Sequence, residues 1–203
     1  MRLAEVSVPT SPAAVAAREV AVEFCSTALL NHSERSYYFA VGFASVAALD
    51  FDAELLYVSA LLHDLGLTEA FDNHRIAFET AGGYAAWALA AGAGWPADRR
   101  RRAVEVIERH MWPSVDPGMD AEGHLLEIAT GLDISGARPD VLPQSFLNEV
   151  LDRFPRLDLG PNFTACLVDQ AARKPESAAA RLVAGGLVEK FAHHPLERQV
   201  SRG

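Results

Sequence analysis

Cysteine is nearly absent from this sequence, which has only Cys25 and Cys166 among its 203 residues. The two thiols are far apart in the sequence, and neither has the spacing to a second ligand that zinc sites show. A disulfide framework and a cysteine-based zinc site are therefore not indicated. Each thiol has apolar neighbours, and free cysteine is among the residues most often buried, so we predict that both belong to the core.

Basic residues are fewer than acidic ones. The sequence has 18 Lys and Arg against 27 Asp and Glu, which gives a formal net charge of -9. Proteins bind phosphate backbones through clustered Lys and Arg, so we expect no nucleic-acid partner. The one basic cluster, Arg99 to Arg102, follows Pro96 and is expected to form the solvated face of a helix.

Long apolar runs are missing as well. Half of the residues are hydrophobic, but no unbroken stretch approaches the roughly 18 residues that a membrane-spanning helix requires. The segment from Met1 to Val22 carries Glu5, Arg18 and Glu19, whereas a signal peptide has a basic end followed by an apolar stretch. We expect no membrane partner and a cytoplasmic location. The sequence does not indicate an oligomeric state and leaves a homo-oligomer open.

Strand-like alternation is scarce, and helical periodicity dominates instead. Ala is frequent, and apolar residues recur three and four positions apart in most segments, which is typical of helices. We predict an all-α fold. The length fits a single domain over residues 1–203, with a core at about 12–175 and a loose tail at 197–203.

Capping residues predict where the helices begin and end. Ser11 has the features of an N-cap, and Asn31 followed by Glu34 resembles a capping box. Gly66 can close a helix in the left-handed conformation. Helices are thus expected at about residues 12–30, 31–50, 52–66, 73–91, 96–111 and 121–134. Beyond them, five prolines divide the chain, and we expect short helices with loops over the core.

A histidine and an aspartate stand side by side in the apolar segment Leu61–Leu67. Burying the unpaired charge of Asp64 among these residues would be costly, so a compensating partner is expected. A metal ion held by His63 and Asp64 would supply one. A chain of this composition contains such a pair by chance in roughly one case in two or three, so further ligand-type residues are needed.

Two other residues supply that support. His32 lies near the expected start of the preceding helix, and Asp133 lies on the apolar stripe of a later one, where a free carboxylate is unfavourable. Taken singly, each has an ordinary alternative as a helix-end residue. Two imidazoles and two carboxylates suit Zn, Fe, Mn or Co. We predict a divalent metal, with zinc favoured, and the ligands His32, His63, Asp64 and Asp133.

The order His, His-Asp, Asp, spread over helices, resembles the HD-domain superfamily of metal hydrolases. Parts of the chain are similar to its cyanamide hydratase branch, closely at His32–Phe39, Leu61–Thr68 and Phe78–Glu79, and more loosely at Ile107–His110, around Asp133 and at Asp169–Pro175. The resemblance covers about residues 21–175. It implies an HD-domain helical bundle and an enzyme that adds water to a small nitrile-type substrate, such as cyanamide, which would give urea.

The resemblance also suggests roles for three residues. A divalent ion lowers the pKa of its bound water from 15.7 to roughly 7, which makes hydroxide available as the nucleophile. Asp64 would orient that water or accept its proton. His110, on the inward face of its helix, is the first candidate to protonate the substrate nitrogen, and its alternative is a core histidine. Glu79 would polarise the substrate, or else pair with Arg75 one turn earlier.

Two other functions remain open. An HD-domain phosphohydrolase acting on a nucleotide or phosphate ester would use the same metal set. Such a site needs cationic or amide donors for the phosphate, yet Leu67 stands where many hydrolases of the superfamily have Lys, and no glycine-rich phosphate loop is present. A helical signalling or scaffold module with a vestigial metal site is the third choice, and the intact ligand positions disfavour it.

Overall fold

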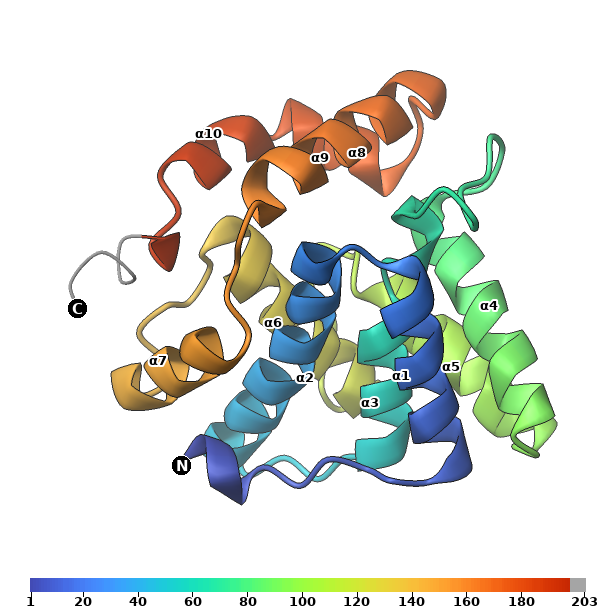
Figure 1. Ribbon diagram of the computed structural model, residues 1–203, viewed down its shortest axis with the longest axis vertical. Coiled ribbons are helices and arrows are strands. Elements are labelled where there is room, and N and C mark those ends of the chain that lie inside the picture. Colours follow the sequence, from blue (N-terminus) through green and yellow to red (C-terminus); the bar gives the residue numbers. More distant parts are fainter. Residues whose placement is uncertain (198–203) are drawn as a thin grey trace.

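The computed structural model describes residues 1–197, which form α-helices and short 3-10 helices and contain no strand (Figure 1). The all-α prediction is confirmed. Residues 198–203, most of the predicted loose tail, lie outside the described residues. The helices are α1 (Pro12–Phe24), α2 (Thr27–Ala47), α3 (Ala53–Leu62), α4 (Phe78–Gly92), α5 (Ala97–Arg109), α6 (Ala121–Ser135), α7 (Gln144–Arg153), α8 (Leu159–Arg173), α9 (Ala178–Ala184) and α10 (Leu187–Ala192), with 3-10 helices η1 (Leu3–Glu5) and η2 (Leu65–Leu67).

The boundary between α1 and α2 lies earlier than predicted. The chain becomes extended at Cys25 and Ser26, and the Ser26 side chain caps α2 by accepting a hydrogen bond from the Leu29 backbone N–H at 3.3 Å. The prediction that Asn31 caps this helix is wrong, because its side chain donates to the Pro155 carbonyl instead. As a result, His32 lies inside α2 rather than at its first residue.

The end of α3 also differs from the prediction. The helix stops at Leu62, so that His63 and Asp64 lie at its C-terminal end, before η2. Gly66 does not close α3, and it is not among the glycines with positive φ. A Cβ atom at Gly66 would lie 2.2 Å from the Phe78 carbonyl oxygen. The position therefore requires glycine because the start of α4 packs directly on the backbone of η2.

Helix α3 occupies the centre of the bundle and contacts α1, α2, α4, α5 and α6 (Figure 1). Its residues from Leu55 to Leu62 are all buried. A helix that is buried all round exposes no polar face, which agrees with its nearly continuous apolar sequence. The His63-Asp64 pair at its end is therefore held by the best-packed element of the fold.

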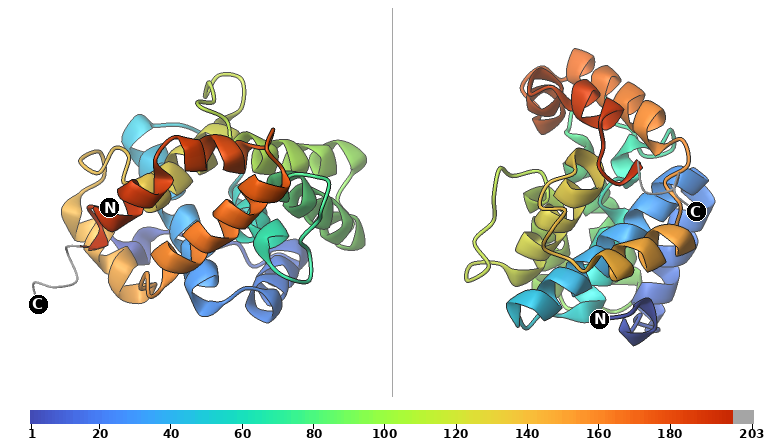
Figure 2. Two further views of the ribbon diagram at one scale, coloured as in Figure 1. Left: turned by 90° about the horizontal axis from the view of Figure 1, so that it is seen from above. Right: turned by 90° about the vertical axis from the view of Figure 1, so that its left-hand side faces the viewer.

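Helices α8, α9 and α10 form a layer across one end of the bundle, seen from the side in Figure 1 and from above in Figure 2. Their apolar residues make a second core, which comprises Leu159, Phe163, Leu167, Ala179 and Leu187 together with Ala28, Phe78 and Ile134 from the layer below. The prediction of short helices is correct for α9 and α10 but wrong for α8, whose Pro161 lies in the first turn and does not interrupt it.

The remaining expectations have mixed outcomes. Helices α5 and α6 lie within two residues of the predicted ranges, whereas α4 begins at Phe78 because the Asn73 side chain accepts two backbone hydrogen bonds in a turn. Glu197, the first residue of the predicted tail, accepts a hydrogen bond from Arg156 at 2.8 Å. The prediction of a single domain stays a prediction.

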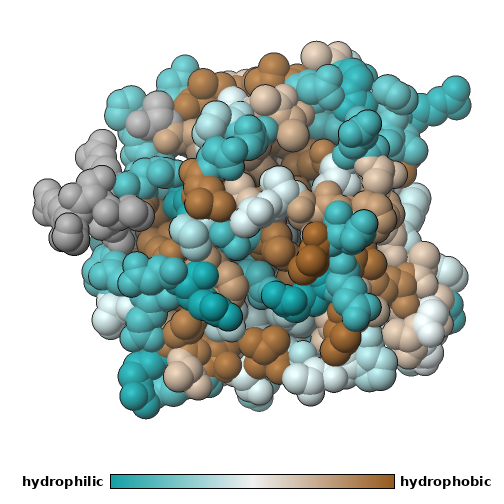
Figure 3. Space-filling model, viewed as in Figure 1, coloured by the Kyte–Doolittle hydropathy of each residue, from teal (hydrophilic) through white to brown (hydrophobic). Residues whose placement is uncertain are grey.

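The surface mixes polar and apolar side chains. On the face drawn in Figure 3, hydrophilic and hydrophobic residues are interspersed, and hydrophobic residues do not form a continuous band. None of the helices described in residues 1–197 combines the length and the apolar character needed to cross a membrane.

Candidate metal centre

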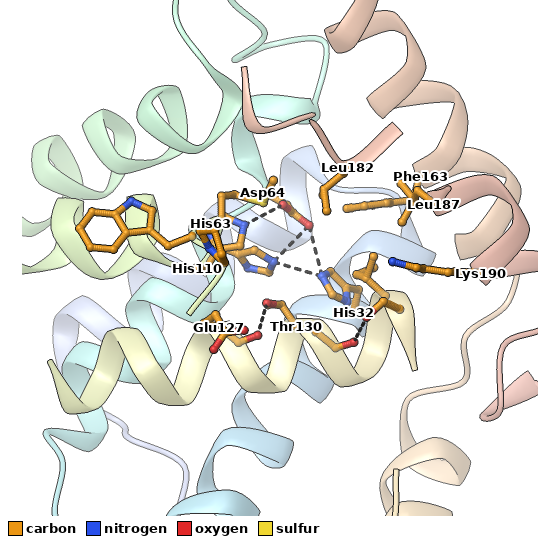
Figure 4. A pocket seen from close by; sticks show the side chains of 16 residues that line it. His32, His63, Asp64, His110, Glu127, Thr130, Phe163, Leu182, Leu187 and Lys190 are labelled. Carbon is orange, nitrogen blue, oxygen red and sulfur yellow. Dashed lines mark hydrogen bonds and ion pairs between the residues drawn. The ribbon is translucent and has the colours of Figure 1, made fainter. Parts of the chain in front are cut away.

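Three predicted ligands meet at one point beneath the α8–α10 layer (Figure 4). The Nε2 atoms of His32 and His63 are 3.1 Å apart, and each lies close to Oδ2 of Asp64, at 3.2 Å from His32 and 3.1 Å from His63. All three side chains are buried. Ligands that each lie about 2.0–2.2 Å from one ion stand about 3.0–3.6 Å apart, so these three atoms fit a shared divalent cation.

The hydrogen bonds around the two imidazoles decide which ring nitrogen faces the cluster. His63 Nδ1 lies 2.8 Å from the Ala60 carbonyl oxygen, and His32 Nδ1 lies 2.6 Å from Asp133 Oδ2. Both partners accept, so each Nδ1 carries the hydrogen. In the neutral rings both Nε2 atoms are then acceptors. A hydrogen-bonded Nδ1 is the usual arrangement of a histidine that binds metal through Nε2.

The carboxylate of Asp64 is buried against these two rings. Neither of its oxygens has a conventional hydrogen-bond partner within residues 1–197. Burial raises the pKa of Asp64, but the nearby His63 and His32 outweigh it and lower the pKa below the usual value. Burial likewise lowers the pKa of His32, and its bonds to Asp133 and Asp64 raise it overall. Two acceptor nitrogens and a carboxylate oxygen thus face one another, and a cation between them would satisfy all three.

Asp133 is the predicted ligand that the structure does not bring into this group. Its carboxylate contacts Nδ1 of His32, on the opposite edge of the ring from Nε2. Arg35 binds the same carboxylate through two nitrogens, with Nη2 2.7 Å from Oδ2, and Arg156 Nη1 lies 2.7 Å from Oδ1. Burial raises the pKa of Asp133, but the two guanidinium groups lower it well below its usual value. Asp133 is thus fully engaged away from the cluster.

His110 follows α5 and joins the cluster from the other side. Its Nδ1 bonds to the Ile107 carbonyl, so its Nε2 is the acceptor, and this atom lies 3.9 Å from Oδ1 of Asp64. The rings of His110 and His63 meet edge to face with centroids 4.8 Å apart. Burial, and secondarily His63, lowers the pKa of His110 to about 3. The ring is neutral at pH 7 and offers a lone pair rather than a proton.

Glu79 lies apart from these residues. It is buried in the first turn of α4, its Oε2 has no partner among the described residues, and burial raises its pKa. It does not line the cavity beside the cluster. The alternative ion pair with Arg75 is not formed within residues 1–197 either. The catalytic role predicted for Glu79 stays a prediction.

A cavity of about 220 Å³ opens beside the cluster, between the end of α5, helix α6 and the α8–α10 layer (Figure 4). Its inner end is formed by His32, His63, Asp64 and His110. The remaining wall is mainly apolar, with Met111, Trp112, Ile134, Phe163, Leu182 and Leu187, and it includes the ionisable residues Glu127 and Lys190. Small apolar cavities with a few convergent polar groups are typical of small-molecule sites.

Two proteins of Saccharomyces cerevisiae are similar to this chain, cyanamide hydratase DDI2 and cyanamide hydratase DDI3. Each is 31% identical over 171 residues, which cover 82% of this chain and 76% of the relative. The chain belongs to the cyanamide hydratase family. This confirms the resemblance predicted from the motifs. No model of a protein family matches the chain, so its placement in the HD-domain superfamily stays a prediction.

Within this member of the cyanamide hydratase family, Glu127 is a cavity residue that sequence reasoning missed. Its Oε2 is buried without a partner among the described residues, and its Oε1 lies 4.0 Å from Nη1 of Arg138. Burial raises the pKa of Glu127. A signal was present, because Glu127, Thr130 and Ile134 recur at helical spacing and all line the cavity. This spacing places the three side chains on one face of α6.

Proposed function

We propose that this protein hydrates cyanamide at a divalent metal held by His32, His63 and Asp64. One water molecule adds across the carbon–nitrogen triple bond of cyanamide, and the product is urea. One observation carries the proposal: two acceptor nitrogens and a carboxylate without a conventional hydrogen-bond partner converge at the inner end of a small cavity. Membership in the cyanamide hydratase family supports the substrate.

The metal that suits this donor set is zinc, with iron, manganese and cobalt as alternatives, because imidazole and carboxylate ligands bind all four. When bound, the ion polarises the cyano group and lowers the pKa of water. His63 is oriented by the Ala60 carbonyl and His32 by Asp133. We therefore propose that Asp133 positions His32 and is not itself a ligand, in place of the four-ligand set predicted from the sequence.

We assign water orientation and proton transfer to His110 and Glu127, two ionisable residues that line the cavity. Because Nδ1 of His110 is committed to the Ile107 carbonyl, its Nε2 would accept a hydrogen bond from the attacking water and orient it. This reverses the role predicted for His110 from the sequence. Glu127 lines the cavity, burial raises the pKa of its carboxyl, and we propose that it donates a proton to the substrate nitrogen. Addition of water across the triple bond gives isourea, which tautomerises to urea.

The phosphohydrolase alternative has little support in the cavity. Lys190 is the one Lys or Arg among the described residues that line it. Arg35 and Arg156, the guanidinium groups behind the cluster, are bound by Asp133. A phosphate would meet a mainly apolar wall without the donors that stabilise its charge.

One set of measurements tests the proposal. The purified protein should contain a divalent metal, convert cyanamide to urea and release no phosphate from nucleoside monophosphates. Asp64→Ala should lose metal and activity together, since it removes a ligand, whereas the exposed Asp140→Asn should keep both. Phosphate release without urea formation would replace the proposal with the phosphohydrolase. Absence of both metal and turnover would favour the scaffold.

A further inference from the structure

The cavity is larger than cyanamide requires. Cyanamide has three non-hydrogen atoms, and at the roughly 30 Å³ that one water occupies in the liquid they fill about 90 Å³. The cavity measures about 220 Å³ and also has to hold the attacking water, so cyanamide and one water together would leave a little under half of it empty. By the same measure the space left beside that water suits about six non-hydrogen atoms. Enzyme sites usually enclose most of the surface of a small ligand, so the unfilled volume indicates a substrate that carries an additional group on cyanamide.

The wall around this spare volume is apolar. Phe163 of α8, Leu182 of α9 and Leu187 of α10 face the cavity from the upper layer, and Ile134 faces it from α6 (Figure 4). These side chains offer no hydrogen bond to the amino group of cyanamide. They do provide contacts for a short methylene chain attached to that nitrogen.

A cation without a partner completes this part of the cavity. Lys190 is an exposed residue of α10 that also lines the cavity, and in Figure 4 its ammonium group points toward the other labelled side chains. Its ammonium group forms no hydrogen bond or ion pair within the part of the chain that the structure describes. By contrast, Arg35 and Arg156 are bound by carboxylates. An anionic group in the cavity would therefore find Lys190 available.

We propose, building on the hydration proposed above, that the substrate is an N-substituted cyanamide whose short chain ends in a carboxylate. The cyano group would lie at His32, His63 and Asp64, and the chain would lie against Phe163 and the leucines, with the carboxylate near Lys190. Water adds across the triple bond of R–NH–C≡N and gives R–NH–CO–NH2, a substituted urea. N-Cyanoglycine, with about seven non-hydrogen atoms, slightly exceeds this volume, so its carboxylate would extend to the exposed Lys190.

The test compares N-cyanoglycine with its primary amide, which has the same number of non-hydrogen atoms and no negative charge. In the wild-type protein we expect kcat/KM for the acid to exceed that for the amide about two- to fivefold, the range of an exposed ion pair. The ratio should fall to about one in Lys190→Met and below one in Lys190→Glu. Arg101→Met, which removes a distant exposed cation, should keep the wild-type ratio.

The outcomes separate this inference from the proposed function. Cyanamide turnover with both substituted compounds inert would overturn the inference and leave the hydratase in place. So would an acid-to-amide ratio of one in the wild type, or a ratio that Lys190→Met leaves unchanged. If none of the three compounds is hydrated, the proposed function fails and the inference fails with it.

Discussion

Nδ1 of His32 lies 2.6 Å from Oδ2 of Asp133, and both side chains are fully buried. Through this contact the carboxylate selects the ring tautomer that directs Nε2 to His63 and Asp64. Arg35 and Arg156 hold the carboxylate in turn. The geometry of the candidate metal site therefore depends on a buried charge network behind it.

Asp133→Asn tests this arrangement. Loss of a group that orients a ligand typically weakens metal binding about 10- to 100-fold, whereas loss of a ligand abolishes it. Leaving two guanidinium groups without their anion should also lower the free energy of unfolding by about 3–5 kcal/mol. Metal titration and urea unfolding measure the two effects, with Asp140→Asn as the control. A metal loss as complete as that of Asp64→Ala would instead make Asp133 a ligand.

Glu127 and Glu79 form a matched pair for testing proton transfer. Both are carboxylates with one buried, unpartnered oxygen among the described residues, and burial raises both pKa values, but only Glu127 lines the cavity. Glu127→Gln should lower kcat at least about 100-fold, the usual effect of losing a general acid. Glu79→Gln should leave kcat within about threefold. Steady-state urea formation measures both, and the opposite order would restore the role predicted for Glu79.

His194 predicts how stability depends on pH. Its side chain is buried, Nδ1 accepts the Leu196 backbone N–H, and burial with nearby Arg156 lowers its pKa to about 4. In the unfolded state the pKa of the His194 imidazole is about 6.5, so between about pH 6.5 and about pH 4 the unfolded chain binds a proton that the folded protein does not. The contribution of neutral His194 to the free energy of unfolding is present above about pH 6.5 and is lost as the pH falls from there to about 4.

The expected loss is about 2 kcal/mol over that interval. Urea unfolding at about pH 7 and about pH 4.5 should show a steeper decline for the wild type than for His194→Gln, which cannot titrate there. Both proteins have the same metal ligands, so the effect of acid on those ligands is the same in both and cancels in the difference between their free energies of unfolding. Identical slopes would show that His194 titrates normally.

Gly66→Ala probes the close contact beneath the cluster. The added Cβ would lie 2.2 Å from the Phe78 carbonyl oxygen, so η2 or the start of α4 must shift. We expect a loss of about 1–3 kcal/mol in the free energy of unfolding, together with weaker metal binding, since Asp64 lies two residues away. Gly92→Ala is the control, because nothing lies within 4 Å of its Cβ, and it should be neutral or slightly stabilising. Full stability and metal affinity in Gly66→Ala would contradict the argument.

Local sequence patterns sufficed for the all-α class, for several helix boundaries and for part of the site. Periodicity and capping are properties of neighbouring residues, so the all-α class and the N-cap Ser11 follow from them. The same patterns gave the wrong cap for α2, where Ser26 and not the predicted Asn31 caps the helix. The cost of burying His63 beside Asp64 also follows from composition alone.

The tertiary structure decided the remainder, because it depends on contacts between residues far apart in the chain. The carboxylate of Asp133 is bound by Arg35 and Arg156, which lie on other elements. The hydrogen bond at Nδ1 of His110 makes its other nitrogen an acceptor, and no periodicity encodes that choice. Lys190 reaches the cavity only because α10 folds back over α6. Residue types thus determined which chemical groups are available, and packing determined which of their atoms point toward the candidate metal site and its cavity.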